Sequence, residues 1–474
     1  MDRKKLKEEE LKILLEENKK NHSLFERKPM VDDAHFLENI GISFPENIKK
    51  NLIAGYVKIW PQDFLVEEVS KDSHVKTVLS GDFFSKEKGF NATDPTLYAT
   101  LVKCEMSTFE AVEEIASYLG TDVKKIQFAG IKDKDAITAQ QISIRGDGAK
   151  KLKDLSYPYF FIKDAYSSNG AVEVGGLKGN KFTLLIRTDK SFDKEKFKKN
   201  LRNIEENGFF NFFYSQRFGS PRFINWFWGL LILKGEYKNA ITSFLCSAGQ
   251  REVDYFKNLR EKIRDNLGNW EKINEIIKPF PLILCNELRV IKYLRDNPSN
   301  FAGALNQIPE QTQMWIYAYA SLIFNRKVSE LALKGKPLPE KLPLILSKDQ
   351  NDWAEYSDFL KEDGISAMPL NNLKPFQNIQ WKKREIKVKE KAIVHDVKII
   401  KEGVVLSFSL PKACYATNFL SHLFLLGSGM PPKNISDKII DTKEVLGEGS
   451  IKDLLEKFKD ISHSKKQDLF EKSE

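Results

Sequence analysis

The hydrophobic pattern of the first half of the chain predicts alternating strands and helices. Residues 97–104 have the apolar pattern of a strand, and the residues between Ser107 and Gly120 have the 3.6-residue pattern of a helix. Ser107 and Glu110 form a capping box at the start of this helix, and Gly120 ends it. Its expected buried face consists of Phe109, Val112, Ile115, Ala116 and Leu119. Helices that alternate with strands in this way require an α/β or α+β core.

A charged turn lies between the next two predicted strands. Apolar residues end at Phe128, and strand-like alternation is clear again at Ile142. The turn between them contains Lys132, Asp133, Lys134 and Asp135. A carboxylate on such a turn can point into a cleft while the strands hold its backbone, and flanking lysines favour its ionised form. Asp133 is therefore a candidate nucleophile. Taken alone, a charged turn of this kind is more often a solvated surface turn.

The second half of the chain has a mainly helical pattern. Helices are expected at 223–234, 237–246, 250–265 and 311–334. Prolines between Pro337 and Pro343 predict a linker, and alternation from Val404 to Leu410 predicts a half-buried strand. Near the N-terminus, the leucines from Leu6 to Leu15 share one face of a charged helix. We expect this helix to be solvated and to cap the fold; an arm that touches RNA is the alternative.

Composition narrows the class of protein. The chain has 474 residues, a formal charge of +9 and 41% hydrophobic residues, which fits a globular protein with a polyanionic partner. The four cysteines form no CxxC pair and the six histidines show no paired spacing, so we expect neither a metal site nor a disulfide framework. This cysteine usage predicts a cytoplasmic protein. No apolar run reaches the length of a membrane span, and the charged N-terminus has no signal peptide pattern.

The charged turn is similar to a known signature. The string G-x-K-D-x-x-A-x-T-x-Q of the TruD family of pseudouridine synthases is matched by Gly130, Lys132, Asp133, Ala136, Thr138 and Gln140. In that family the Asp of the Lys-Asp pair is the nucleophile, which places this role on Asp133. An earlier segment resembles the motif G-x-x-K-x-x-P-E-D-F-x-V-x-E, with Gln62 in place of the usual Glu. Because this motif lies beside the active site in the family, Lys58 and Glu68 are further site candidates.

Two more motifs follow the signature in the family's order. Residues 175–187 resemble G-x-x-x-G-N-x-F-x-x-x-x-R, in which Gly179-Asn180 predicts a hairpin turn before a strand. The aromatic segment 208–223 could stack bases and grip phosphate, or could form a core strand, and its composition does not decide between these.

The aromatic segment resembles the family's N-Y-F-G-x-Q-R-F-G, which is matched by Asn211, Phe213, Gln216, Arg217, Phe218 and Gly219. The resemblance implies that Phe213 stacks near the target base and that Asn211 helps to place the catalytic Asp. Arg217 and Lys132 would supply basic contacts to the RNA. Tyr214 stands where the family has Gly, which puts the local backbone in doubt.

The C-terminal motif L-P-x-G-x-Y-A-T-x-x-L-R-E is matched in part. Ser421 and His422 replace its Arg-Glu pair, so any role of that pair is lost here.

The matched motifs span roughly residues 55–422, and the resemblance implies an α+β fold. Its catalytic domain has a mixed, mainly antiparallel sheet flanked by helices, and a mainly helical α/β insertion interrupts it. We expect an N-terminal helical extension (1–45), a catalytic domain in two parts (46–225 and 391–460), the insertion (226–390) and a charged tail (461–474). The long insertion resembles the archaeal and eukaryotic branch.

The resemblance implies an RNA pseudouridine synthase that acts on tRNA, at uridine 13 in this family. No group is lost in this isomerisation, so no nucleotide, metal or other cofactor is expected. The expected partner is tRNA, and other RNAs are possible substrates. We expect no membrane partner, and we expect the protein to be a monomer. A non-catalytic RNA-binding protein on the same fold is the alternative. A glycoside-type hydrolase that uses Asp133 with Glu68 is a third hypothesis, and it predicts release of free uracil.

Overall fold

The computed structural model describes residues 3–26, 29–91, 95–366, 368–377 and 379–462. The predicted charged tail lies mostly outside these residues. Eleven strands form one large sheet in the order β1-β15-β2-β8-β3-β6-β4-β7, with β14 also beside β8, β13 beside β14, and β5 beside β6. In chain order these strands are β1 (Met30–Val31), β2 (Ile53–Tyr56), β3 (Phe64–Ser70), β4 (Thr96–Cys104), β5 (Ile126–Phe128), β6 (Ile137–Arg145), β7 (Phe160–Ser168), β8 (Leu177–Arg187), β13 (Ile393–Ile400), β14 (Gly403–Pro411) and β15 (Phe424–Ser428).

Two small two-stranded sheets and a series of helices complete the fold. The small sheets pair β10 (Lys341–Pro343) with β11 (Glu385–Lys387), and β9 (Phe209–Phe210) with β12 (Lys389–Glu390). The helices are α1 (Arg3–Lys20), α2 (Ala34–Asn39), α3 (Glu46–Lys49), α4 (Thr108–Leu119), α5 (Lys194–Asn207), α6 (Asn225–Leu233), α7 (Tyr237–Cys246), α8 (Asp254–Asp265), α9 (Trp270–Ile277), α10 (Cys285–Asp296), α11 (Phe301–Leu305), α12 (Pro309–Leu333), α13 (Gln350–Ala354), α14 (Ser357–Glu362), α15 (Leu370–Leu373), α16 (Ala416–Leu420), α17 (Thr442–Leu446), α18 (Lys452–Lys457) and α19 (Lys459–Ser462).

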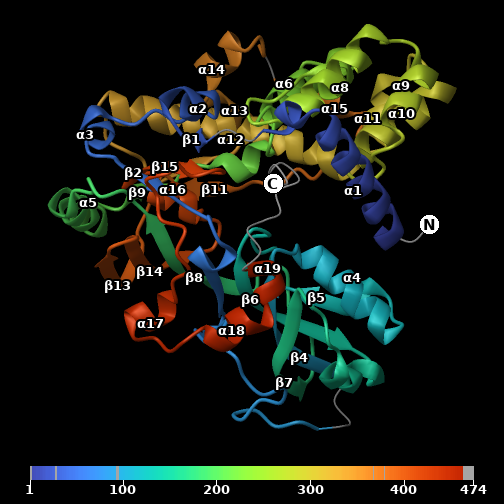
Figure 1. Ribbon diagram of the computed structural model, residues 1–474. Coiled ribbons are helices and arrows are strands. Elements are labelled where there is room, and N and C mark those ends of the chain that lie inside the picture. The colour runs from blue at the N-terminus through green and yellow to red at the C-terminus, as the bar shows by residue number, and fades with distance from the viewer. Residues whose placement is uncertain (1–2, 27–28, 92–94, 367, 378, 463–474) are drawn as a thin grey trace.

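The sheet is mixed and mainly antiparallel. Only the β15–β2 and β3–β6 pairs are parallel among the strands described in the large sheet. In Figure 1 the long helices α6, α8, α10 and α12 gather at one end of the molecule, while β4, β6 and β7 lie at the other with α4 and α18 beside them. The predicted fold class is confirmed, and the chain after β14 returns to the sheet as β15.

Opposite faces of the sheet are covered by helices from distant parts of the chain. Side chains of β4 and β6 that include Leu101 and Ile142 form one buried cluster with Val112 and Ile115 of α4. The alternate side chains of the same strands form a second cluster with α18. This two-sided burial follows from the period of two in a strand. The charged turn between β5 and β6 leaves the sheet near its junction with α4.

The capping box predicted for α4 is present. Ser107 Oγ accepts from the Glu110 backbone N, the Glu110 carboxylate accepts from the Ser107 backbone N, and Gly120 ends the helix in the left-handed region. One expectation for this helix is wrong, because Phe109 is 52% exposed rather than buried. Phe109 lies in the first turn of the helix, and its phenyl ring contacts the ring of Phe128 on β5.

The predicted hairpin turn at Gly179-Asn180 is also wrong, because both residues lie inside β8. The glycine is required there by a close approach between strands. A Cβ on Gly179 would lie 2.0 Å from the carbonyl oxygen of Leu410 on β14. The expected proline linker is likewise not entirely irregular, since Pro343 belongs to β10.

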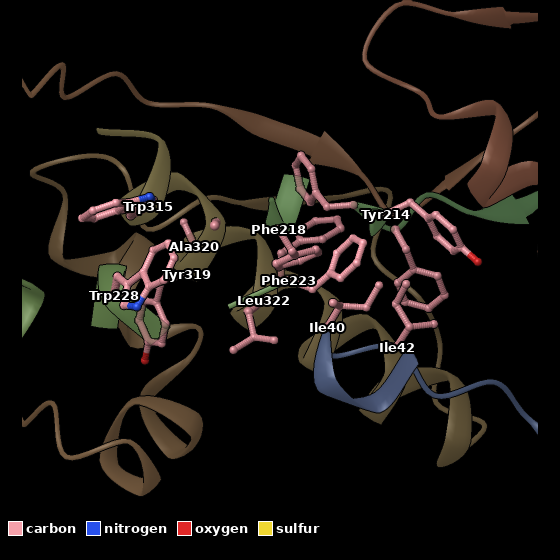
Figure 2. Close-up of a cluster of buried hydrophobic side chains, with 14 of the residues drawn as sticks. Ile40, Ile42, Tyr214, Phe218, Phe223, Trp228, Trp315, Tyr319, Ala320 and Leu322 are labelled. Atoms are coloured by element: carbon pink, nitrogen blue, oxygen red, sulfur yellow. The ribbon is translucent and has the colours of Figure 1, made fainter. Parts of the chain in front are cut away.

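One continuous hydrophobic core joins the sheet to the helices and to the N-terminal segment. Figure 2 shows Ile40 and Ile42 of that segment beside Tyr214, Phe218 and Phe223, with the tryptophans of α6 and α12 further along the same cluster. The predicted division into an extension, a two-part catalytic domain and an insertion stays a prediction.

The N-terminal helix α1 is bound to this core at two points. Leu14 is buried, and the buried Glu10 carboxylate accepts hydrogen bonds from the backbone N of Leu282 and Ile283. Leu11 and Leu15 remain exposed, so only part of the predicted leucine face is covered.

Candidate functional site

Asp133 lies on the loop between β5 and β6, and its side chain is 31% exposed. Its Oδ1 is 3.2 Å from the Nζ of Lys58, which precedes β3. Its backbone carbonyl accepts a hydrogen bond of 2.6 Å from the Nζ of Lys103 on β4. One lysine therefore contacts the carboxylate, and a second contacts the main-chain carbonyl of the same residue. The structure brings Lys58 and Asp133 together across 75 residues of sequence.

Lys58 is held in an unusual backbone conformation. Its φ of +60° lies in the left-handed region, which costs a residue with a Cβ about 1–2 kcal/mol. Its ammonium group lies 4.2 Å from the centre of the Phe64 ring, so the aromatic face and Asp133 share the cation. From this turn the Lys58 side chain reaches the carboxylate of Asp133.

Lys132 and Glu68, which sequence reasoning placed at the substrate, are both buried and face each other. The Nζ of Lys132 is 2.8 Å from Glu68 Oε2 and donates a hydrogen bond of 2.7 Å to Asn180 Oδ1. Glu68 Oε1 accepts from the backbone N of Gln141. In this structure the pair ties the loop to β3 and β8, and it presents neither charge to solvent.

Further buried polar groups fix the loop on both sides of Ile131. The backbone N of Lys132 donates to Thr108 Oγ1 at 3.1 Å, and Thr108 Oγ1 donates to Gln140 Oε1 at 2.9 Å. Gln140 Nε2 in turn donates to the carbonyl of Gly130 at 3.1 Å. These bonds connect α4, β6 and the loop, so the loop carrying Asp133 is anchored in buried structure.

Lys103 belongs to the candidate site through its contact with the Asp133 carbonyl, and sequence reasoning did not identify it. Its side chain is fully buried, and burial lowers its pKa to about 8, although the nearby Asp133 opposes this change. Cys104, Lys132 and Glu110 also act on it electrostatically. A lysine within the mainly apolar strand pattern of 97–104 was the available signal, because a buried ammonium group needs a polar partner.

Asn211, Phe213 and Arg217 form a second cluster around the segment between β9 and α6. Asn211 Nδ2 donates to the carbonyl of Lys387 at 3.2 Å. The guanidinium carbon of Arg217 is 5.3 Å from the centre of the Phe213 ring, which is buried. Asn325 of α12 fixes the Phe213 backbone, since its Oδ1 accepts from the Phe213 N and its Nδ2 donates to the Phe213 O.

The Phe213 ring also joins distant halves of the chain. It makes edge contacts with Phe324 of α12 and with Tyr415, which precedes α16. Among the described residues, no hydrogen bond, ion pair or ring contact links this cluster to Asp133. The expected approach of Asn211 and Phe213 to the carboxylate therefore stays a prediction.

The doubt about Tyr214 is resolved by its conformation. Its φ is −100°, in the extended region that any residue adopts, so no glycine is needed here. The ring is buried, and its hydroxyl donates a hydrogen bond of 2.7 Å to Asp32 of the N-terminal segment. Asp32 also pairs with Arg251 at 2.6 Å. His422, at the position of the family's Glu, is likewise buried and accepts from the backbone N of Phe210.

Neither a metal-binding cluster nor a membrane-spanning helix occurs in the described part of the chain. No group of three or more His, Cys, Asp or Glu side chains could hold a metal ion within those residues. None of the helices in the described ranges is long and apolar enough to cross a membrane.

The comparisons with known proteins agree on one family. The family model described as tRNA pseudouridine synthase D (TruD) matches residues 48–344. A tRNA pseudouridine synthase D of Aquifex aeolicus is 28% identical over 405 residues, which cover 76% of this chain and 98% of the relative. The corresponding archaeal protein of Methanococcus aeolicus is 31% identical over 286 residues, covering 58% of this chain and 69% of the relative. A crystal structure from Methanosarcina mazei with the same family name superposes with a TM-score of 0.61 at 22% identity, covering 82% of this chain and 97% of that one.

Proposed function

Because this chain belongs to the tRNA pseudouridine synthase D (TruD) family, we propose that it isomerises a uridine of tRNA to pseudouridine with Asp133 as the nucleophile. The reaction breaks the bond between ribose C1′ and uracil N1, turns the base, and rejoins it through C5. The product has the same atoms as the substrate, so no oxidant, reductant or group donor is consumed. We further propose uridine 13 as the target, in line with the resemblance of the sequence.

The observation that carries this proposal is the setting of the Asp133 carboxylate. It is partly exposed, it pairs with Lys58 at 3.2 Å, and its main chain is fixed from below by Lys103. A nucleophile must be accessible to the reacting carbon and must be held in one position, because misplacement of about 1 Å is costly to the rate. The partial exposure of the Asp133 side chain and its anchored main chain support this assignment.

The surrounding residues receive distinct roles in the proposal. Lys58 is a charge that can remain with the carboxylate or contact a phosphate of the RNA. The buried pair of Lys132 and Glu68 positions the loop, and this pairing leaves Glu68 poorly placed to act as the acid of a hydrolase. Phe213 would stack against the extruded uracil and Asn211 would help to place Asp133, with Arg217 as a basic contact beside the ring.

We also propose that the protein is located in the cytoplasm. All four cysteines are free thiols, which supports a protein of the reducing cytoplasm.

A uridine inside folded tRNA must first be extruded, at a cost of roughly a few kcal/mol that contacts to the RNA must offset.

The identity of the product tests the function. The wild-type protein is incubated with uridine-labelled tRNA, and the digested nucleosides are separated by chromatography and mass spectrometry. Formation of pseudouridine without free uracil supports the isomerase. Release of uracil would instead indicate the hydrolase, and bound but unchanged tRNA would indicate an RNA-binding protein. Mapping pseudouridine in RNA from cells with and without the gene then identifies the target uridine.

A further inference from the structure

The loop that carries Asp133 also exposes a large apolar side chain. Ile131, two residues before the nucleophile candidate, is 64% exposed. Phe109, at the start of α4, is exposed as well, and its ring lies 5.7 Å from the ring of the half-buried Phe128. Single exposed apolar residues are common, whereas a group of them beside a functional site indicates a contact surface. We call Ile131, Phe109 and Phe128 the apolar rim.

The exposure of Ile131 is imposed by its two neighbours. The Gly130 carbonyl is bound by Gln140, and the Lys132 backbone N is bound by Thr108. The Lys132 side chain is also buried against Glu68. Since the main chain is fixed on both sides, Ile131 cannot turn into the core without breaking buried hydrogen bonds. The result is an apolar side chain on a rigid support.

The rim is continuous with the proposed catalytic site. The hydrogen bond between Lys132 N and Thr108 Oγ1 joins the residue after Ile131 to the residue before Phe109, so the rim members lie around one junction of loop and helix. Lys134 follows Asp133 and is exposed, and it lies 3.8 Å from Glu110 on α4. Apolar and aromatic side chains mixed with cations suit RNA, whose bases stack and whose phosphates are anionic.

We propose that Ile131 inserts into the tRNA at the gap left by the extruded uridine, while Phe109 and Phe128 contact the bases that flank this gap. The inference rests on the proposed function, because it assumes a target uridine at Asp133. An apolar wedge replaces the stacking that the neighbouring bases lose when one base leaves. It thereby favours the extruded state without contacting the reacting atoms, so Ile131 is a positioning residue.

The experiment separates extrusion from chemistry. In one arm, Asp133→Asn protein binds tRNA that carries 2-aminopurine next to the target uridine, and the fluorescence rise reports unstacking. In the other arm, single-turnover rates of pseudouridine formation are measured with Asp133 intact. The variants are Ile131→Ala, Ile131→Leu and, as a matched control, Ile393→Ala, because Ile393 is also 64% exposed but lies on β13.

The wedge predicts a loss that depends on RNA structure. Ile131→Ala lowers the rate on folded tRNA about tenfold, the effect expected for losing most of one buried aliphatic side chain. The loss stays below about twofold on an unstructured oligonucleotide, whose uridine is already largely unstacked. The fluorescence rise falls in parallel, Ile131→Leu restores both signals, and melting temperatures remain equal among the variants.

A second variant tests the aromatic part of the rim. Phe109→Ala weakens tRNA binding about fivefold or more, as loss of a base-stacking ring does. The control Phe227→Ala, an exposed phenylalanine on α6, leaves binding unchanged.

Three results would overturn the inference. Ile131→Ala and Ile393→Ala could give the same fluorescence rise and the same single-turnover rate. This would also be the outcome if the apolar rim binds a protein instead of RNA. Ile131→Ala could slow the reaction equally on folded and unstructured RNA, which would indicate damage to the loop. The 2-aminopurine fluorescence could rise equally for Asp133→Asn protein with and without the Ile131→Ala change. If the wild-type protein makes no pseudouridine, the proposed function fails, but the fluorescence arm still decides whether Ile131 unstacks the RNA.

Discussion

Lys103, which is buried and contacts the main chain of Asp133, gives a prediction about pH. As the pH rises, we expect the stability of the protein to increase and its activity to decrease. Lys103 has its pKa lowered from 10.5 to about 8, first because burial disfavours its charge. At 1.36 kcal/mol for each pKa unit, the charged form is disfavoured by about 3 kcal/mol in the folded protein. Between pH 8 and 10.5 the unfolded chain therefore binds the Lys103 proton more tightly than the folded protein does. The free energy of unfolding should rise with pH through this window by about 3 kcal/mol on account of Lys103.

Activity should change in the other direction. The ammonium group of Lys103 donates to the Asp133 carbonyl and places a positive charge beside the carboxylate. Above pH 8 this charge is lost, and the rate of pseudouridine formation should fall. Lys103→Met keeps the length of the side chain but removes the charge and the donor. We expect it to be slower by about 10- to 100-fold at pH 7, as for other losses of site positioning, without the alkaline decline of the wild type.

Two measurements on the same pair of proteins check this. Denaturant titrations at pH 7.5, 9 and 10 give the free energy of unfolding, and the difference between wild type and Lys103→Met isolates the Lys103 contribution from other titrating groups. Single-turnover rates across the same pH range give the activity. Parallel stability curves for the two proteins would refute the assigned titration. An alkaline decline that persists in Lys103→Met would refute the catalytic consequence.

Two further predictions concern the scaffold. Glu68→Gln leaves the Lys132 ammonium buried without a counter-charge and should lower the free energy of unfolding by about 3–5 kcal/mol. The double variant Glu68→Gln/Lys132→Met should recover part of this loss. Equal denaturation midpoints for wild type and Glu68→Gln would contradict the prediction. Gly179→Ala forces a methyl group against the Leu410 carbonyl and should cost about 1–3 kcal/mol, the range for overpacking. Its control, Gly89→Ala, meets open space and should stay within about 0.5 kcal/mol by thermal denaturation monitored by circular dichroism.

Local sequence signals predicted the elements that flank the site. The capping box of α4, its terminal glycine and the strands on either side of the charged turn depend on residues close together in the chain. Hydrogen bonds and side-chain periodicity act over this range, so the sequence contains enough information for them. The mixed sheet was accessible only through the resemblance, because the pairing of β8 with both β3 and β14 joins distant segments.

Most of what the sequence did not predict depends on contact between residues far apart in the chain. Gly179-Asn180 has the composition of a turn, but the approach of β14 is what requires the glycine. The role of Lys132 at the substrate stays a prediction, and its burial against Glu68 and Asn180 depends on residues distant in the sequence. The extended backbone of Tyr214 needs no glycine, and its hydroxyl donates to Asp32, 182 residues away. Polar partners of this kind cannot be assigned from periodicity.

The central claim is that the Asp133 carboxylate performs the reaction, and one comparison tests it most directly. Asp133→Asn keeps the size of the side chain and removes its charge, while Asp135→Asn makes the same change at an exposed position two residues further along the loop. Single-turnover pseudouridine formation on tRNA is measured for both variants at saturating protein. We predict tight binding but no detectable product with Asp133→Asn, and a rate near that of the wild type with Asp135→Asn. Equal product from Asp133→Asn and the wild type would contradict the account.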